Sequence, residues 1–296
     1  MIKYATKIVF CALATVIGTV LGGMFSTTLR IAQPKIPGQA NAGLLLVYTL
    51  SGGVVLSVAL AELSKCLGGN RRIRFAVIAF FAYAWLGINN TIEASIFTTV
   101  GGGIFVIVTM LFPCVFVAGA VGPLFGNREP GKSFSDAARG FFDHQTAAQW
   151  ILRLSLAVLA FPAVYFCFGM PVGLLVGKFY QEQSFGLHMP SLGVVIGVQL
   201  VRSLIALLAV LPILIVWPGS RPRLAWTLGL SLFVVSGLYG LIQAYWMPWT
   251  LRGIHTVELL FDSLVYGWLV AALLSPRTLV HHPAPVEETG VRNYTA

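Results

Sequence analysis

Apolar stretches of about 20 residues recur along the chain and are separated by short polar segments. A helix rises 1.5 Å per residue, so about 20 apolar residues cross the roughly 30 Å hydrocarbon core of a bilayer. Strands of a membrane barrel would alternate polar and apolar residues over about 10 positions, and the sequence has no such pattern. We therefore predict an all-α polytopic membrane protein with about eight transmembrane helices, at 8–29, 44–67, 75–97, 104–125, 151–176, 191–217, 225–247 and 251–274.

The third of these spans has a mixed composition. Its first part, up to Ile88, is apolar, whereas the segment from Asn89 to Thr99 is polar. Two interpretations stay open: a full helix that faces a polar interior, or a shorter helix followed by a re-entrant segment. The first span follows two lysines as a signal peptide would, but no small-residue cleavage site follows it, so we interpret it as an uncleaved helix.

Composition agrees with this class and excludes others. The chain has 296 residues, of which 57% are hydrophobic and only 10% are charged, against roughly 25% charged residues in soluble domains. Disordered chains are poor in apolar residues, so disorder is excluded as well. The four cysteines form no Cys-x-x-Cys pair, and we predict neither a disulfide framework nor thiol redox chemistry.

The net charge of +9 reports orientation. If the N-terminus is cytoplasmic, 14 Lys and Arg residues fall in cytoplasmic segments and four in outer ones. This bias follows the positive-inside rule and predicts both termini on the cytoplasmic side of a plasma (inner) membrane. Membrane orientation thus explains the excess of basic residues, and we expect no nucleic acid as a partner. The partner that we do expect is the lipid bilayer.

The chain divides into a transmembrane domain, 1–274, and a disordered cytoplasmic tail, 275–296. The longest cytoplasmic loop, 126–150, contains a segment from Ser133 to Trp150 that we predict as an interfacial amphipathic helix or a simple connector. Eight spans can be divided into four plus four, but the sequences of the halves show no convincing match. The lipid side of the predicted interfacial helix holds Phe134, Ala138, Phe141 and Phe142.

Ionisable side chains inside the spans are the most informative feature, because each is costly in hydrocarbon. At 1.5 Å per residue, Arg202 and Asp262 both lie about 16 Å from the outer end of their spans, and the other polar positions lie about 6–12 Å deep. On each of four helices these residues share a face, so we predict a polar cavity that opens outward. The candidate residues for substrate binding or a proton relay are Asn89, Glu93, Gln199, Arg202, Gln243, His255, Glu258, Asp262 and Tyr266.

Structural interpretations of the same residues stay open. Arg202 and Asp262 at equal depth can form a salt bridge that clamps two spans together. Glu93 can be protonated and hydrogen-bonded to Asn89, one helical turn away. We predict a separate surface ion pair between Glu62 and Lys65, three residues apart near the cytoplasmic end of their helix.

Three functions fit this pattern. The first is a transporter or flippase-like protein, proton-coupled, for a small polar or amphipathic molecule or ion. The second is an intramembrane enzyme or metal site, in which Glu93, His255 and Glu258 bind a divalent metal such as Zn²⁺. The third is a non-catalytic subunit or sensor with a membrane-protein partner or a second copy of itself. We favour the first, with no required cofactor and no enzymatic activity.

Overall fold

The computed structural model describes residues 2–36, 41–126 and 133–275, and this part of the chain is helical, with one isolated β-bridge between loops. Eight helical segments are long and apolar enough to cross a membrane, which confirms the predicted class. The predicted tail lies outside the described residues. The elements are α1 (Ile2–Thr28), α2 (Ala42–Cys66), α3 (Arg71–Tyr83), η1 (Ala84–Asn89), α4 (Asn90–Phe97), α5 (Gly103–Phe125), α6 (Phe134–Phe142), α7 (Ala147–Gln181), η2 (Ser184–Gly186), α8 (Leu192–Ile215), α9 (Arg221–Phe233), η3 (Val234–Leu238), α10 (Tyr239–Gln243) and α11 (Trp249–Leu274).

The third span is a full helix with a change of winding in its middle. Elements α3, η1 and α4 run without a break from Arg71 to Phe97, and η1 is a π-helix. The interpretation as a re-entrant segment is therefore wrong. The seventh span is built in the same way, because α9, the π-helix η3 and α10 follow one another. A π-helical turn widens the helix locally and is frequent at functional sites.

Close contact between α1 and α5 depends on two glycines four residues apart. A Cβ atom on Gly18 would lie 2.6 Å from the Cα of Pro113, and one on Gly22 would overlap the backbone of Thr109. A buried hydrogen bond of 2.9 Å between Ser26 and Thr109 follows one turn further along. Small residues at this spacing allow two membrane helices to approach with their backbones in contact.

The loop after α5 differs from the prediction. One continuous amphipathic helix from Ser133 to Trp150 does not form; instead α6 ends at Phe142, and α7 begins at Ala147 behind a capping box made by Thr146 and Gln149. The side chain of Ser133 caps α6 by accepting a hydrogen bond from Asp136 N at 3.1 Å. Phe141 does not face lipid but is buried, with its ring 5.0 Å from that of Trp150. The amphipathic pattern of the sequence continues from α6 into α7, but the helix does not, because the capping box of Thr146 and Gln149 starts a new helix.

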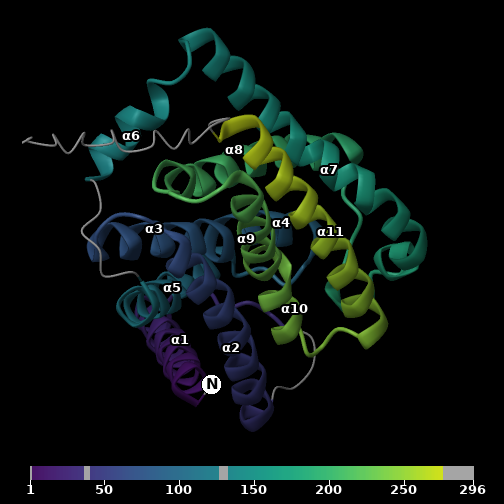
Figure 1. Ribbon diagram of the computed structural model, residues 1–296. Coiled ribbons are helices and arrows are strands. Elements are labelled where there is room, and N and C mark those ends of the chain that lie inside the picture. The colour runs from purple at the N-terminus through teal and green to yellow at the C-terminus, as the bar shows by residue number, and fades with distance from the viewer. Residues whose placement is uncertain (1, 37–40, 127–132, 276–296) are drawn as a thin grey trace, which may run out of the picture.

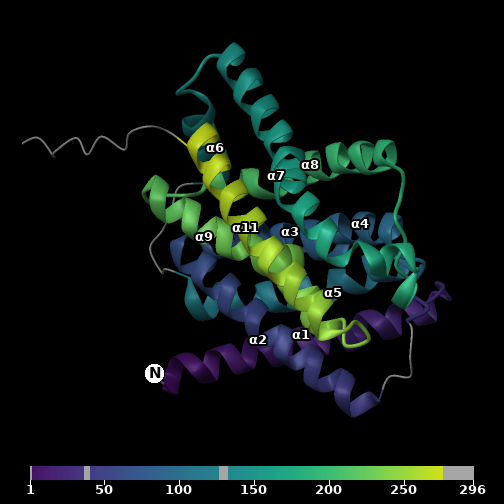
Figure 2. The same cartoon turned by 90° about the vertical axis from the view of Figure 1, so that its right-hand side faces the viewer.

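Buried apolar side chains concentrate where α2, α3, α5, α8 and α9 meet. Helix α7 lies at the edge of the bundle and is exposed along much of its length (Figure 1). Seen from the side, α11 crosses the bundle in front of α3 and α5, beside α7 and α9 (Figure 2). The charged residues of the spans that line internal cavities belong to α4, α8 and α11.

Candidate functional site

Arg202, on α8, is the centre of a buried hydrogen-bond cluster. Its Nη1 donates to Glu93 Oε1 at 2.6 Å and to Gln199 Oε1 at 3.0 Å. Its Nε donates to Asn89 Oδ1 at 2.8 Å, and Asn89 Nδ2 donates back to the Arg202 carbonyl oxygen at 2.9 Å. The cluster thus joins α8 to the η1–α4 segment, and it gives a buried guanidinium the charge partner and acceptors that it needs.

A second polar pair lies on α11. His255 Nδ1 and Glu258 Oε2 are 2.6 Å apart, and the other ring nitrogen of His255 is 3.3 Å from the hydroxyl of Tyr180 on α7. Gly169 on α7 leaves room for the carboxylate, because a Cβ atom there would be 3.2 Å from Glu258 Oε1. The pair is therefore shaped by both α7 and α11.

Asp262 lies one turn beyond Glu258 and differs from both other carboxylates. Its Oδ1 is buried and has no hydrogen-bond partner among the described residues, and the same holds for Trp85 Nε1 and the Tyr266 hydroxyl. All three side chains line an inner recess of about 40 Å³, a volume sufficient for a water molecule. Water in this recess would supply the hydrogen bond that Asp262 Oδ1 lacks.

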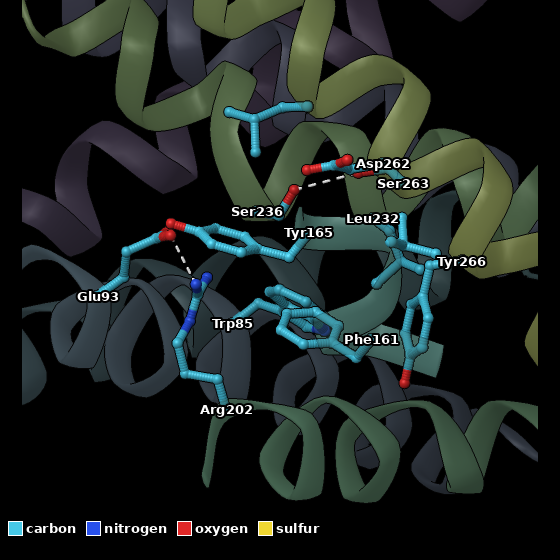
Figure 3. A pocket seen from close by; sticks show the side chains of 12 residues that line it. Trp85, Glu93, Phe161, Tyr165, Arg202, Leu232, Ser236, Asp262, Ser263 and Tyr266 are labelled. Atoms are coloured by element: carbon cyan, nitrogen blue, oxygen red, sulfur yellow. Dashed lines mark hydrogen bonds and ion pairs between the residues drawn. The ribbon is translucent and has the colours of Figure 1, made fainter. Parts of the chain in front are cut away.

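The recess adjoins a larger cavity of about 300 Å³, and Glu93, Tyr165 and Asp262 line both. Figure 3 shows the ring of Tyr165 reaching across this space toward Glu93, with Asp262 on the opposite wall. The larger cavity lies among the last turns of α4 and α10, the end of α7 and the first turns of α11. These ends lie on the side of the membrane that the charge pattern predicts to be outer.

The rim of the cavity is partly made by the loop after α7. Leu187 is buried in the cavity wall, and the loop is attached to the end of α4 by backbone hydrogen bonds. Thr99 N donates to the Gly186 oxygen at 2.7 Å, and His188 N donates to the Phe97 oxygen at 3.0 Å. The connection between the fifth and sixth predicted spans is thus a short, attached segment, because α7 continues to Gln181.

The structure brings together eight of the nine candidate residues and corrects their pairing. Arg202 forms its ion pair with Glu93, so the predicted clamp between Arg202 and Asp262 is wrong. Glu93 and Asn89 do not bond each other, because both are engaged by Arg202. Equal depth in the membrane did not identify the partner, since the choice depends on which helices are neighbours.

Gln243 is the candidate that lies elsewhere. It sits at the end of α10 against α2, where its Nε2 would be 3.4 Å from a Cβ atom on Gly52, and it bonds the Tyr239 carbonyl oxygen at 3.4 Å. Its depth and helical face were compatible with the cavity. Gln243 shares its helical face with Tyr239, and this face packs on Gly52 of α2 rather than on the cavity.

The proposed metal ligands are occupied by other partners. Glu93 is paired with Arg202, whereas Glu258 and His255 are paired with each other. Across residues 2–36, 41–126 and 133–275, no group of three His, Cys, Asp or Glu side chains is arranged to hold a metal ion. This geometry does not favour a site built from Glu93, His255 and Glu258.

Several lining residues carry no signal in the sequence. Tyr165, Trp85 and Ser236 line the cavity or its recess, but aromatic and small polar residues inside apolar spans are common and no spacing singles these out. Only their neighbours in the bundle give them a role.

Comparison with known proteins gave no match: no family model, no curated protein and no solved structure is significantly similar to this chain. Fold and site together define a class, which is a multi-pass helical membrane protein with a polar cavity inside its transmembrane region.

Proposed function

We propose that this protein is a transporter that exchanges a small organic cation for a proton, and that Asp262 binds the two in turn. The observation that carries the proposal is the Asp262 carboxylate, which faces an intramembrane cavity without a partner of its own among the described residues. An unpaired carboxylate in a low-dielectric site is stabilised by a bound cation or by protonation.

The charge balance of the cavity supports a cationic substrate. Three carboxylates line it, those of Glu93, Glu258 and Asp262, and Arg202 is the one guanidinium in its recess wall. Glu93 and the neighbouring amides already engage the Nη1 and Nε of this guanidinium, and the Glu93 carboxylate balances its charge, which disfavours an anionic substrate. When all three carboxylates are ionised, the cavity keeps at least one uncompensated negative charge, even with His255 charged.

The shape of the site supports an organic cation. Aromatic rings of Tyr165, Tyr180 and Trp246 line the same space, and such rings attract alkylammonium groups through their π faces. A cavity of about 300 Å³ has room for a small molecule of this kind. The recess beside Asp262 provides water-sized space through which a proton can leave the carboxyl group.

Exchange follows because the cation and the proton compete for the Asp262 carboxylate. When the cation binds, the Asp262 carboxyl group releases its proton, and when the cation leaves, the carboxylate takes a proton up again. Charge in the cavity is conserved in both states, because one positive charge replaces another. The buried Glu93–Arg202 pair fixes the wall opposite Asp262 and need not change its own protonation.

Purified protein in liposomes that contain a pH-sensitive dye tests this directly. An inward gradient of tetramethylammonium chloride should raise the internal pH, while an equal gradient of sodium chloride should not. Asp262→Asn should reduce the response to that of protein-free liposomes, and Glu182→Gln, in the exposed loop after α7, should leave it unchanged. Equal responses of wild type and Asp262→Asn would refute the proposal.

A second pair of variants tests the shape of the cavity without removing a charge. Gly169→Val places a side chain against the Glu258 carboxylate and should slow the exchange. Gly173→Val, one turn along the same helix, has open space around it and should behave as wild type. Unchanged exchange in Gly169→Val would show that the substrate does not use this part of the cavity.

A further inference from the structure

The inner elements of the two halves of the chain begin at a constant spacing. Helices α2 and α8 begin at residues 42 and 192, α3 and α9 begin at 71 and 221, and the π-helices η1 and η3 begin at 84 and 234. Each pair is 150 positions apart. Identical residues at this spacing are few and include Gly69 with Gly219, Arg71 with Arg221, and Gly87 with Gly237.

The packing of the halves is reciprocal. Helix α2 packs against the third span of the second half (α9, η3 and α10), and α8 packs against the third span of the first half (α3, η1 and α4). Likewise α1 packs on α5, and α7 packs on α11. Each half contributes four spans, so both halves begin on the same side of the membrane, which is the arrangement of parallel repeats about an axis along the membrane normal.

This spacing pairs every member of the Arg202 cluster with a residue of the other half. The pairs also agree in burial: each is buried at both positions except Glu93 and Gln243, which are both half-buried. The pairs are Asn89 with Tyr239, Glu93 with Gln243, Gln199 with Thr49, and Arg202 with Gly52.

The counterparts meet in space as the cluster does. Gly52 faces Tyr239 and Gln243, since a Cβ atom on it would be 3.3 Å from the Tyr239 ring and 3.4 Å from Gln243 Nε2. At the paired positions of the Arg202 cluster, Arg202 faces Asn89 and Glu93 in the same way. A tyrosine ring over a glycine thus occupies the place that an arginine and an asparagine occupy in the other half.

We infer that the chain consists of two tandem copies of a four-helix unit, and that Asn89, Glu93 and Arg202 are kept at one of two equivalent contacts for the ligand of the cavity. The other contact is made by Gly52, Tyr239 and Gln243, none of which is charged. The fold therefore does not require an ion pair at this position. Arg202 and Asn89 are positioning residues that hold the Glu93 carboxylate at the cavity wall.

Exchange of the three residues for their counterparts tests the equivalence. Arg202→Gly alone leaves Glu93 unpaired beside a void and should lower the unfolding temperature by roughly 10 °C. Asn89→Tyr/Glu93→Gln/Arg202→Gly should recover most of this loss, because the new ring covers the new glycine as Tyr239 covers Gly52. Glu93→Gln/Arg202→Gly, which lacks the ring, should stay destabilised. A triple variant no more stable than this double variant would overturn the duplication.

The assignment of the Arg202 cluster to the ligand rests on the proposed exchange activity and is tested by a separate measurement. The stable triple variant should lose tetramethylammonium-driven proton exchange, and wild-type exchange in it would overturn the assignment of the cluster to the ligand. If wild-type protein shows no exchange, the proposed function fails, while the stability series still decides the duplication.

Discussion

Two ion pairs of nearly equal length in one molecule allow burial to be tested as the source of electrostatic stability. Arg202 Nη1 and Glu93 Oε1 are 2.6 Å apart, and Lys65 Nζ and Glu62 Oε1 are 2.7 Å apart, the latter as predicted from their spacing. The side chains of Arg202 and Glu93 are 4% and 26% exposed, whereas those of Lys65 and Glu62 are 36% and 52% exposed. We predict that these pairs differ several-fold in coupling energy.

The expected magnitudes follow from what each single substitution leaves behind. Glu93→Gln leaves a buried guanidinium with only neutral acceptors, and breaking a buried pair in this way costs about 3–5 kcal/mol. Arg202→Met costs less, because the Glu93 carboxylate borders the cavity and can be hydrated or protonated. The double variant removes both charges and should be little worse than Glu93→Gln alone, so the coupling energy equals the cost of Arg202→Met. The coupling energy of the buried pair is then about 2 kcal/mol, and that of the exposed pair is below about 1 kcal/mol.

Reversible unfolding of purified protein in mixed micelles, followed by tryptophan fluorescence, measures both double-mutant cycles. Glu62→Gln and Lys65→Met provide the matched cycle for the exposed pair. Salt should weaken the exposed coupling and leave the buried one nearly unchanged. Equal coupling energies for the two pairs, or equal salt dependence, would refute the argument from burial.

Two further predictions concern packing and orientation. Gly22→Leu should force α1 away from the backbone of Thr109 and reduce the yield of folded, monodisperse protein, while Gly23→Leu, which meets nothing within 4 Å, should not; equal yields would contradict the close approach of α1 and α5. In intact cells, an impermeant maleimide should label Glu182→Cys and not Ser135→Cys in a background without other cysteines, because the charge pattern predicts opposite sides for these loops. The reverse labelling pattern would invert the predicted orientation.

The transmembrane class and the eight spans could be predicted because hydrocarbon thickness imposes a length that is readable in sequence. The polar residues of those spans were also recognisable, since a charged group at membrane depth stands out against apolar neighbours. Depth and helical face grouped Asn89, Glu93 and Arg202 together, and the hydrogen bonds of Arg202 show that the three side chains meet. That they bind a substrate or relay protons stays a prediction.

Partners within the site were not predictable in the same way. Asp262 and Glu93 were equally plausible partners of Arg202 by depth, and only the packing of α8 on η1 and α4 decided for Glu93. Gln243 had a suitable depth and lies outside the cavity, because the face that it shares with Tyr239 packs on Gly52 of α2. The spacing of the two residues shows that they share a face, but not which neighbouring helix that face meets.

Sequence by itself determined that the chain crosses the membrane and where its costly polar groups lie, because both depend on the transfer of individual residues into hydrocarbon. The tertiary structure decided which polar groups meet and which one is left without a partner. It also decided that Gly52 and Tyr239 form an uncharged contact where Arg202 forms a charged one in the other half of the chain. These are properties of neighbouring helices, and the rotation and order of helices in a bundle come from side-chain packing between distant segments rather than from the composition of any one of them.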